Sequence, residues 1–197
     1  MLAIHYRNRF FAFTEWIGKG EAPLNNGEKT DVLLKIDLAI SSPKKFISYE
    51  KGIVELHIPN YIIDLDEGEE ELFKNIQKRM RTDIRRAMEK DNFDFVEIAR
   101  PTAEEIKEFK HFYDSFAKMK NTPLCNEGKL ISLMERKALM LTYVKDETGE
   151  VLCGGASILD KASRQFYALY GFSNRLKADG PPEKRRIGRA NKLLHWK

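Results

Sequence analysis

The chain has 197 residues, of which 42% are hydrophobic and 32% charged, and its formal net charge is +4. These values are ordinary for one soluble globular domain, and no apolar run approaches the ~20 residues that would span a membrane. The N-terminus has no secretory cleavage pattern, and the mild charge is far below that of a dedicated nucleic-acid-binding protein.

The cysteines and histidines indicate neither a disulfide framework nor a metal site. Cys125 and Cys153 lie in unrelated contexts, and the four histidines are scattered. Cys153 has no histidine at a recognisable spacing, so a thiol nucleophile is not indicated. We therefore expect metal-free chemistry in a reducing compartment, the cytoplasm.

The first part of the chain is predicted as an N-terminal aromatic segment, residues 1–30, followed by a single domain, residues 31–197. In the segment, four aromatic side chains are expected to form a plug on the main core: Phe10, Phe11, Phe13 and Trp16. Three short β-rich runs bounded by turn residues then predict strands: Val32–Leu38, Ile53–Ile58 and Tyr61–Leu65.

Residues 68–90 are predicted to form one amphipathic helix. Its apolar stripe has helical spacing: Phe73, Ile76, Met80, Ile84 and Ala87. The rest of its surface is strongly basic, and two readings stay open: a solvated face, or a patch that binds a polyanion or a phosphorylated acceptor. The candidate patch residues are Lys78, Arg81, Arg85 and Arg86.

The middle of the chain alternates between strands and helices. A strand is expected at Phe93–Ile98, and the capping box Thr102–Glu105 opens a second amphipathic helix. A short helix at about Glu127–Arg136 is followed by three strands joined by tight turns, which predict an antiparallel meander. These strands are Leu139–Lys145, Val151–Leu159 and Arg164–Phe172. Gly154 and Gly155 in the middle strand indicate a bulge or a close backbone approach by a ligand. This mixed order favours an α+β fold.

The last stretch is predicted as a charged loop, residues 175–185, and a helix that begins at about residue 186. The joint reads Arg-x-x-Gly-x-Ala and comprises Arg185, Arg186, Ile187, Gly188, Arg189 and Ala190. A glycine lets the backbone approach a ligand closely, and the free N–H groups of a helix N-terminus favour a phosphate. Neighbouring arginines add charge-assisted donors. The joint is therefore a candidate cofactor-binding site.

This joint resembles the acyl-coenzyme A pyrophosphate signature of the GNAT acyltransferase superfamily. Together with KRMRTDIRRAMEK (78–90), GEVLCGGAS (149–157), YGFSN (170–174) and IGRANKLLHW (187–196), it is similar to the FemABX subgroup, which builds peptidoglycan cross-bridges. The resemblance covers roughly residues 60–197. It implies a mixed, largely antiparallel central sheet flanked by helices. It also implies an N-acyltransferase in which an amine attacks the donor carbonyl directly.

The resemblance also implies site residues and partners. The donor carbonyl would bind backbone amides of one strand: Tyr167, Leu169, Tyr170 and Gly171. The pyrophosphate would bind the N–H groups of residues 186–190. The donor would be acyl-CoA or aminoacyl-tRNA, and the acceptor a small-molecule or cell-wall-precursor amine. The basic helix 74–90 would suit either a tRNA or a diphosphate-linked acceptor. Ser173 and Asn174 are polar candidates for contacting either substrate, with turn capping as the alternative.

The family continues with a further strand and helix, whereas this chain stops at Lys197. We therefore expect a GNAT-like domain without its C-terminal strand and helix, and either a homodimer that completes the sheet edge or an impaired enzyme. The alternative function is a non-catalytic GNAT-like module whose basic helix, residues 74–90, binds an anionic partner such as RNA or a glycan.

Overall fold

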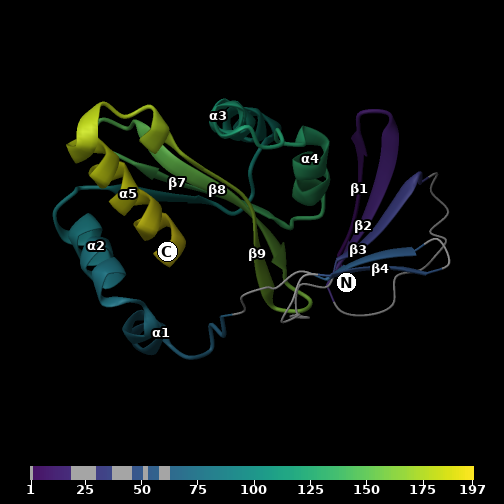
Figure 1. Ribbon diagram of the computed structural model, residues 1–197, viewed down its shortest axis with the longest axis horizontal. Helices are drawn as coiled ribbons and strands as arrows, with labels where there is room; N and C mark the ends of the chain where they lie inside the picture. The colour runs from purple at the N-terminus through teal and green to yellow at the C-terminus, as the bar shows by residue number, and fades with distance from the viewer. Residues whose placement is uncertain (1, 19–29, 37–45, 51–52, 58–62) are drawn as a thin grey trace.

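The computed structural model describes residues 2–18, 30–36, 46–50, 53–57 and 63–197 (Figure 1). The elements before the main sheet are β1 (Leu2–Asn8), β2 (Phe11–Ile17), β3 (Val32–Ile36), β4 (Phe46–Glu50), β5 (Ile53–His57), α1 (Glu69–Asn75) and α2 (Lys78–Glu89). Those that follow are β6 (Asp94–Ile98), α3 (Ala103–Lys120), α4 (Glu127–Glu135), β7 (Leu139–Lys145), β8 (Val151–Asp160), β9 (Gln165–Ser173), the 3-10 turn η1 (Asn174–Leu176) and α5 (Gly180–Trp196). None of the helices described has the length and apolar character needed to cross a bilayer.

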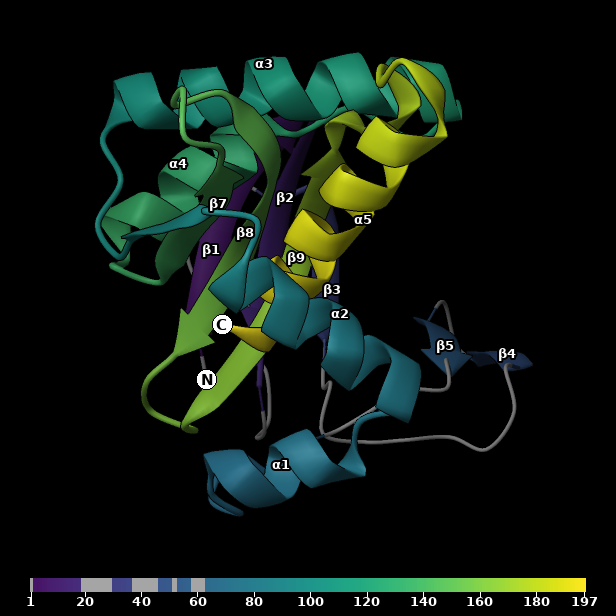
Figure 2. The same cartoon turned by 90° about the vertical axis from the view of Figure 1, so that its left-hand side faces the viewer.

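The main sheet is antiparallel, with strand order β6-β7-β8-β9, so the predicted α+β architecture is confirmed. Helix α3 packs on one face, where Phe109 and Phe112 contact the ring of Phe172 from β9. Helix α5 packs on the other face, where Ile187 and Ala190 lie against β7 and β8. Figure 2 shows α3 along the top of the molecule and α5 across the sheet. Each face of the sheet thus has its own core.

Helix α3 begins where the capping box predicts. The Glu105 N–H donates to Thr102 Oγ1 (3.3 Å), and the Thr102 N–H donates to Glu105 Oε2 (2.7 Å). The helix ends at Asn121, whose left-handed conformation is common at such positions. Local hydrogen bonds therefore cap α3 at both of its ends.

The N-terminal strands form a second sheet, β1-β2-β3, that rests on α4. Ile4 and Ile17 are its buried anchors, and they join the core on the α3 side of the main sheet. The predicted aromatic plug is wrong for Phe10, which is 88% exposed, and for Phe11, which is 55% exposed, at the turn between β1 and β2, whereas Phe13 and Trp16 are half-buried. The boundary predicted at residue 30 falls between β2 and β3, which pair with each other in parallel.

The single helix predicted for residues 68–90 is wrong: it is broken into α1 and α2 at Ile76, whose backbone is extended. Arg81 from α2 stabilises the break by donating to the carbonyl oxygens of Ile76 (2.9 Å) and Lys74. Phe73 packs edge-to-face on Trp196 at the end of α5, with ring centroids 4.9 Å apart. The apolar spacing continues through the break, so the pattern alone could not reveal it.

Two further predictions change. In the run predicted as a strand at 61–65, residues 63–65 are not a strand, and the first two lie outside the described residues. The space beside Gly154 is filled by neighbouring strands and is not open to a ligand. A Cβ added there would lie 2.7 Å from the Phe172 ring and 2.9 Å from the Thr142 carbonyl oxygen. Glycine is needed at this position for close packing between the strands.

Candidate functional site

Helix α5 starts at Gly180, six residues before the predicted helix start at 186, so the loop predicted for 175–185 is wrong over its second half. The backbone N–H groups of residues 186–190 therefore lie in the second and third turns of the helix, where each is directed at a carbonyl oxygen four residues earlier. They are not the free donors of a helix N-terminus.

The true N-terminus of α5 is a poor cradle for a phosphate. Two of its first four residues, Pro181 and Pro182, have no backbone N–H to donate. Asp179 precedes the helix and Glu183 lies in its first turn, so both nearby carboxylates oppose an anion. This end of α5 therefore lacks the free backbone N–H groups that a pyrophosphate needs.

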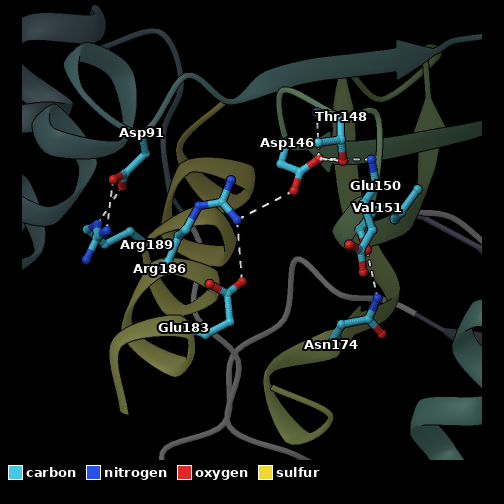
Figure 3. A network of polar contacts seen from close by, with 9 residues as sticks. All are labelled: Asp91, Asp146, Thr148, Glu150, Val151, Asn174, Glu183, Arg186 and Arg189. Atoms are coloured by element: carbon cyan, nitrogen blue, oxygen red, sulfur yellow. Dashed lines mark hydrogen bonds and ion pairs between the residues drawn. The ribbon is translucent and has the colours of Figure 1, made fainter. Parts of the chain in front are cut away.

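Two of the three arginines of the predicted joint, Arg186 and Arg189, form ion pairs within the protein (Figure 3). Arg189 makes a two-pronged pair with Asp91, with Nε to Oδ2 at 2.5 Å and Nη2 to Oδ1 at 2.8 Å. Arg186 lies 3.5 Å from Asp146 and 3.4 Å from Glu183, and its guanidinium stacks on Phe93. These contacts fasten α5 to the loops at one end of the sheet.

Asp146 organises the turn between β7 and β8 that receives Arg186. Burial pushes the pKa of Asp146 up, but hydrogen bonds from Thr148 and Glu150 outweigh it and, with the Arg186 charge, hold the pKa below its ordinary value. The Thr148 hydroxyl lies 2.7 Å from its Oδ1, and the N–H groups of Thr148 and Glu150 each lie 3.0 Å away. The carboxylate is thus ionised and already has its partners.

The other joint residues divide between packing and solvent. Ile187 and Ala190 are buried against the sheet. Gly188 faces open space, because a Cβ added there would meet nothing within 4 Å. Arg185 is exposed, and no ion pair is recorded for it in the described part of the chain.

Strand β9 lies at the edge of the main sheet and carries the residues predicted to bind the donor carbonyl. Ala168 pairs with Ser157 and Tyr170 with Ala156, so Leu169 has no partner on β8 and forms a bulge. A Cβ added to Gly171 would meet nothing within 4 Å. Among the described residues β9 pairs only with β8, so its outer edge presents backbone N–H and C=O groups that no other strand uses.

Tyr170 joins this strand to the loop between α3 and α4. Its hydroxyl accepts a hydrogen bond from the Asn126 N–H (3.3 Å), and its ring lies 4.8 Å from that of Tyr113. Burial raises the pKa of Tyr170 to about 12, so the phenol is protonated at neutral pH. The Tyr167 hydroxyl instead donates to the side chain of Gln165, along the strand.

Ser173 and Asn174 cap the end of β9. Ser173 Oγ accepts from the Arg175 N–H (3.4 Å), and Asn174 Nδ2 donates to the Val151 carbonyl oxygen (2.7 Å). The Ser173 contact agrees with the turn-capping alternative, whereas Asn174 instead links the end of β9 to the start of β8.

Three of the four predicted basic patch residues line one groove of about 470 Å³ on α1 and α2. Its lining consists of Phe73, Lys74, Lys78, Arg81, Thr82 and Arg85, and includes no carboxylate. Arg86 does not line it. The Arg81 guanidinium also donates to the Ile76 carbonyl oxygen at the end of α1. The Arg85 guanidinium lies over the Phe73 ring, 5.2 Å from its centroid. The Phe73 ring and the cations form one surface suited to an anion. The apolar spacing of the sequence could not indicate that this ring lies among the cations.

Both cysteines are free and buried. Burial raises the pKa of Cys125 and of Cys153 to about 12, so neither is a thiolate at neutral pH. No group of three or more histidine, cysteine, aspartate or glutamate side chains that could hold a metal is found in the described ranges.

The architecture is similar to that of a protein of known structure. No protein-family model matches the chain, and no curated protein matches its sequence. A crystal structure of FemX matches it with a TM-score of 0.50 and 14% identity. The fold is FemX-like. The match covers 66% of this chain and 46% of the FemX chain, so this chain spans less than half of FemX. At this identity the likeness concerns the fold alone.

Proposed function

We propose that this chain is an aminoacyl transferase that moves an aminoacyl group from the ester of an aminoacyl-tRNA to an amine. The observation that carries the proposal is the bulged, open edge of β9. Backbone N–H groups along this edge would hold the ester carbonyl and stabilise the negative charge that develops on its oxygen. The FemX-like fold supports this function.

The reaction would need positioning rather than a covalent enzyme intermediate. The neutral amine attacks the ester carbonyl carbon, a C–N bond forms, and the C–O bond to the ribose breaks. The proton leaves the amine nitrogen and ends on the ribose oxygen. The main contribution of the protein is to hold the two groups together. A small-molecule or cell-wall-precursor amine is the acceptor class that we infer.

The N-terminus of α5 favours an aminoacyl-tRNA over acyl-CoA as the donor. A CoA pyrophosphate bound in the GNAT manner needs several free N–H groups at that end of the helix. Pro181 and Pro182 remove two of them, and Asp179 and Glu183 add negative charge. The free backbone N–H groups that usually bind a pyrophosphate are therefore missing from the N-terminus of α5.

The groove on α1 and α2 supplies the cations that an RNA backbone requires. Lys78 and Arg85 are exposed there, with Lys74 beside them. Phosphate contacts of this kind give affinity that falls steeply with salt. We infer that the groove binds phosphates of the tRNA and leaves the aminoacyl end free to reach β9.

The edge of β9 also bears on the quaternary structure. An open strand edge pairs readily with another strand. We infer a homodimer in which a second copy of this chain pairs with part of this edge and leaves the N–H groups around the Leu169 bulge free for the ester carbonyl. The two free, buried cysteines accord with a cytoplasmic location, where aminoacyl-tRNA is available.

Filter binding of labelled aminoacyl-tRNA over a series of salt concentrations tests the groove. The variant Lys78→Ala/Arg85→Ala should weaken binding and reduce the salt slope by about 0.7–0.9 for each phosphate that the protein no longer neutralises. The matched control Arg79→Ala/Arg86→Ala removes the same charge from the same helix outside the groove, and should bind like the wild type. Equally weakened binding by both variants would contradict a specific role for the groove.

Transfer of the labelled amino acid to an amine tests the site on β9. Gly171→Val adds a side chain in open space on the edge strand, so it should keep the fold and tRNA binding but abolish transfer. A wild-type chain that binds tRNA without transferring its amino acid would instead be the non-catalytic binding module. A rise in melting temperature with acetyl-CoA would overturn the choice of donor.

A further inference from the structure

The turn that joins β1 to β2 projects two phenylalanines into solvent. The register pairs Asn8 with Phe11, so Arg9 and Phe10 alone form the turn. Phe10 is 88% exposed and Phe11 55% exposed, and Phe10 has the highest exposure recorded for a large apolar side chain among the described residues. Two neighbouring phenylalanines at this exposure contribute little to the core, so folding alone does not account for them.

The backbone of the turn is strained by the residue that it carries. Arg9 has φ of 55°, a left-handed conformation in which glycine or asparagine is usual for two-residue hairpin turns. An arginine there has a steric penalty that glycine would avoid. Its long cationic side chain therefore sits beside the two phenylalanines at a cost in stability.

The loop between α3 and α4, which carries an exposed leucine, lies against β1, and a second cation precedes the turn on that strand. Asn126 Nδ2 donates to the Arg7 carbonyl oxygen (3.2 Å), which brings the loop between α3 and α4 against β1. Leu124, two residues earlier in that loop, is 51% exposed. In the described part of the chain no ion pair is recorded for Arg7 or Arg9, and both are exposed. The nearby Asp31 carboxylate accepts from the Ala12 N–H (2.8 Å).

We propose that this turn, together with Leu124, docks on the surface of an anionic lipid bilayer. Phenylalanine and leucine side chains insert at the boundary between headgroups and acyl chains, and flanking arginines bind the acidic headgroups. A two-residue turn is narrow and convex, and it offers far less than the ~800 Å² per partner of a standard protein interface. The mixture of apolar tip and exposed cations fits a bilayer better than a protein groove.

The docking would be weak and reversible, because one shallow anchor of this size binds far less strongly than a spanning helix. It would also orient the molecule. Asn126 contacts both Arg7 at the turn and Tyr170 on β9, so the membrane contact is joined to the candidate site by direct hydrogen bonds. If the proposed transfer holds, β9 would then lie near acceptors carried at the membrane surface.

Co-sedimentation with vesicles tests the proposal without donor or acceptor, so its outcome is separate from that of the transfer assay. The wild-type chain should bind vesicles that contain phosphatidylglycerol and bind those of phosphatidylcholine alone much less. Phe10→Ala/Phe11→Ala should reduce binding to the anionic vesicles by about tenfold or more. Phe166→Ala, which removes an exposed phenylalanine from the start of β9, is the matched control and should bind normally.

Arg9→Gly separates a membrane role from a structural one. Relief of the left-handed strain should raise the melting temperature, whereas removal of the cation should weaken binding to anionic vesicles. Absence of wild-type binding to any vesicle would overturn the proposal, as would undiminished binding of the double phenylalanine variant. Sedimentation showing a wild-type dimer that the double variant disrupts, without vesicle binding, would assign the turn to a protein interface and likewise overturn it.

Discussion

Replacing Arg189 with methionine should destabilise the fold strongly, because it leaves the Asp91 carboxylate without its partner. The pair is bidentate, and its side chains are only 13% and 9% exposed. Removing one member of a buried pair typically costs about 3–5 kcal/mol, and we expect about 3 kcal/mol here since both groups retain some contact with water. With a typical urea slope of about 2 kcal/mol per molar, the unfolding midpoint should fall by roughly 1.5 M.

Arg185→Met is the control for this prediction. It removes the same charge from the same helix, but Arg185 is exposed, so its replacement should change the free energy of unfolding by less than about 0.5 kcal/mol. Urea unfolding followed by far-ultraviolet circular dichroism measures both variants. Equal, small effects of the two substitutions would refute the structural role of Arg189 and return it to the set of candidate ligand-binding residues.

Three further predictions test the site. Gly188→Ala should raise the free energy of unfolding by about 0.8–1 kcal/mol, because the glycine lies within a helix and faces open space. The variant should bind tRNA as the wild type does. Weaker binding of the variant would indicate that a phosphate approaches the backbone closely at this position. The pKa of Asp146 is lower in the folded than in the unfolded chain, so its stabilisation is complete above the unfolded value of about 4 and is lost as the pH falls through the folded value. Urea midpoints measured over this acidic range should therefore depend less on pH in Asp146→Asn than in the wild type, and identical profiles would contradict the assignment. Cys125 and Cys153 should react with a thiol reagent at neutral pH only after unfolding, and rapid labelling of the native chain would show that their burial is wrong.

The meander and α3 were predictable because their signals are local. Tight turns separate β7, β8 and β9, and the Thr102 capping box is satisfied by its own hydrogen bonds. The start of α5 was missed although a signal was present. Proline is favoured in the first turn of a helix, and Asp179 is a common residue type at the N-cap, so Pro181 could have been read as a helix start rather than as part of a loop.

Other features depend on contacts that the order of residues does not disclose. The break between α1 and α2 is stabilised by Arg81, which bonds the carbonyl oxygens across it. The turn at Arg9 carries no glycine, so no hairpin was predicted there, and the exposure of Phe10 contradicts its predicted place in the aromatic plug. The bulge at Leu169 arises from register with β8 and has no local signature.

We base the choice of aminoacyl-tRNA as the proposed donor on the groups that remain available at each end of α5. Near the N-terminal end of α5, Pro181 and Pro182 provide no N–H groups, and Arg186 and Arg189 further along the helix are paired with carboxylates. The cationic groove lies at the other end, where Phe73 packs on Trp196. The 17 residues of α5 separate the two ends by about 25 Å. A compact pyrophosphate placed as in a GNAT enzyme would sit at the end where two prolines remove backbone donors and Arg186 is already paired. A nucleic acid, whose phosphates repeat along its length, can meet the groove while its esterified end reaches β9, and this geometry is the reason to test aminoacyl-tRNA before acyl-CoA.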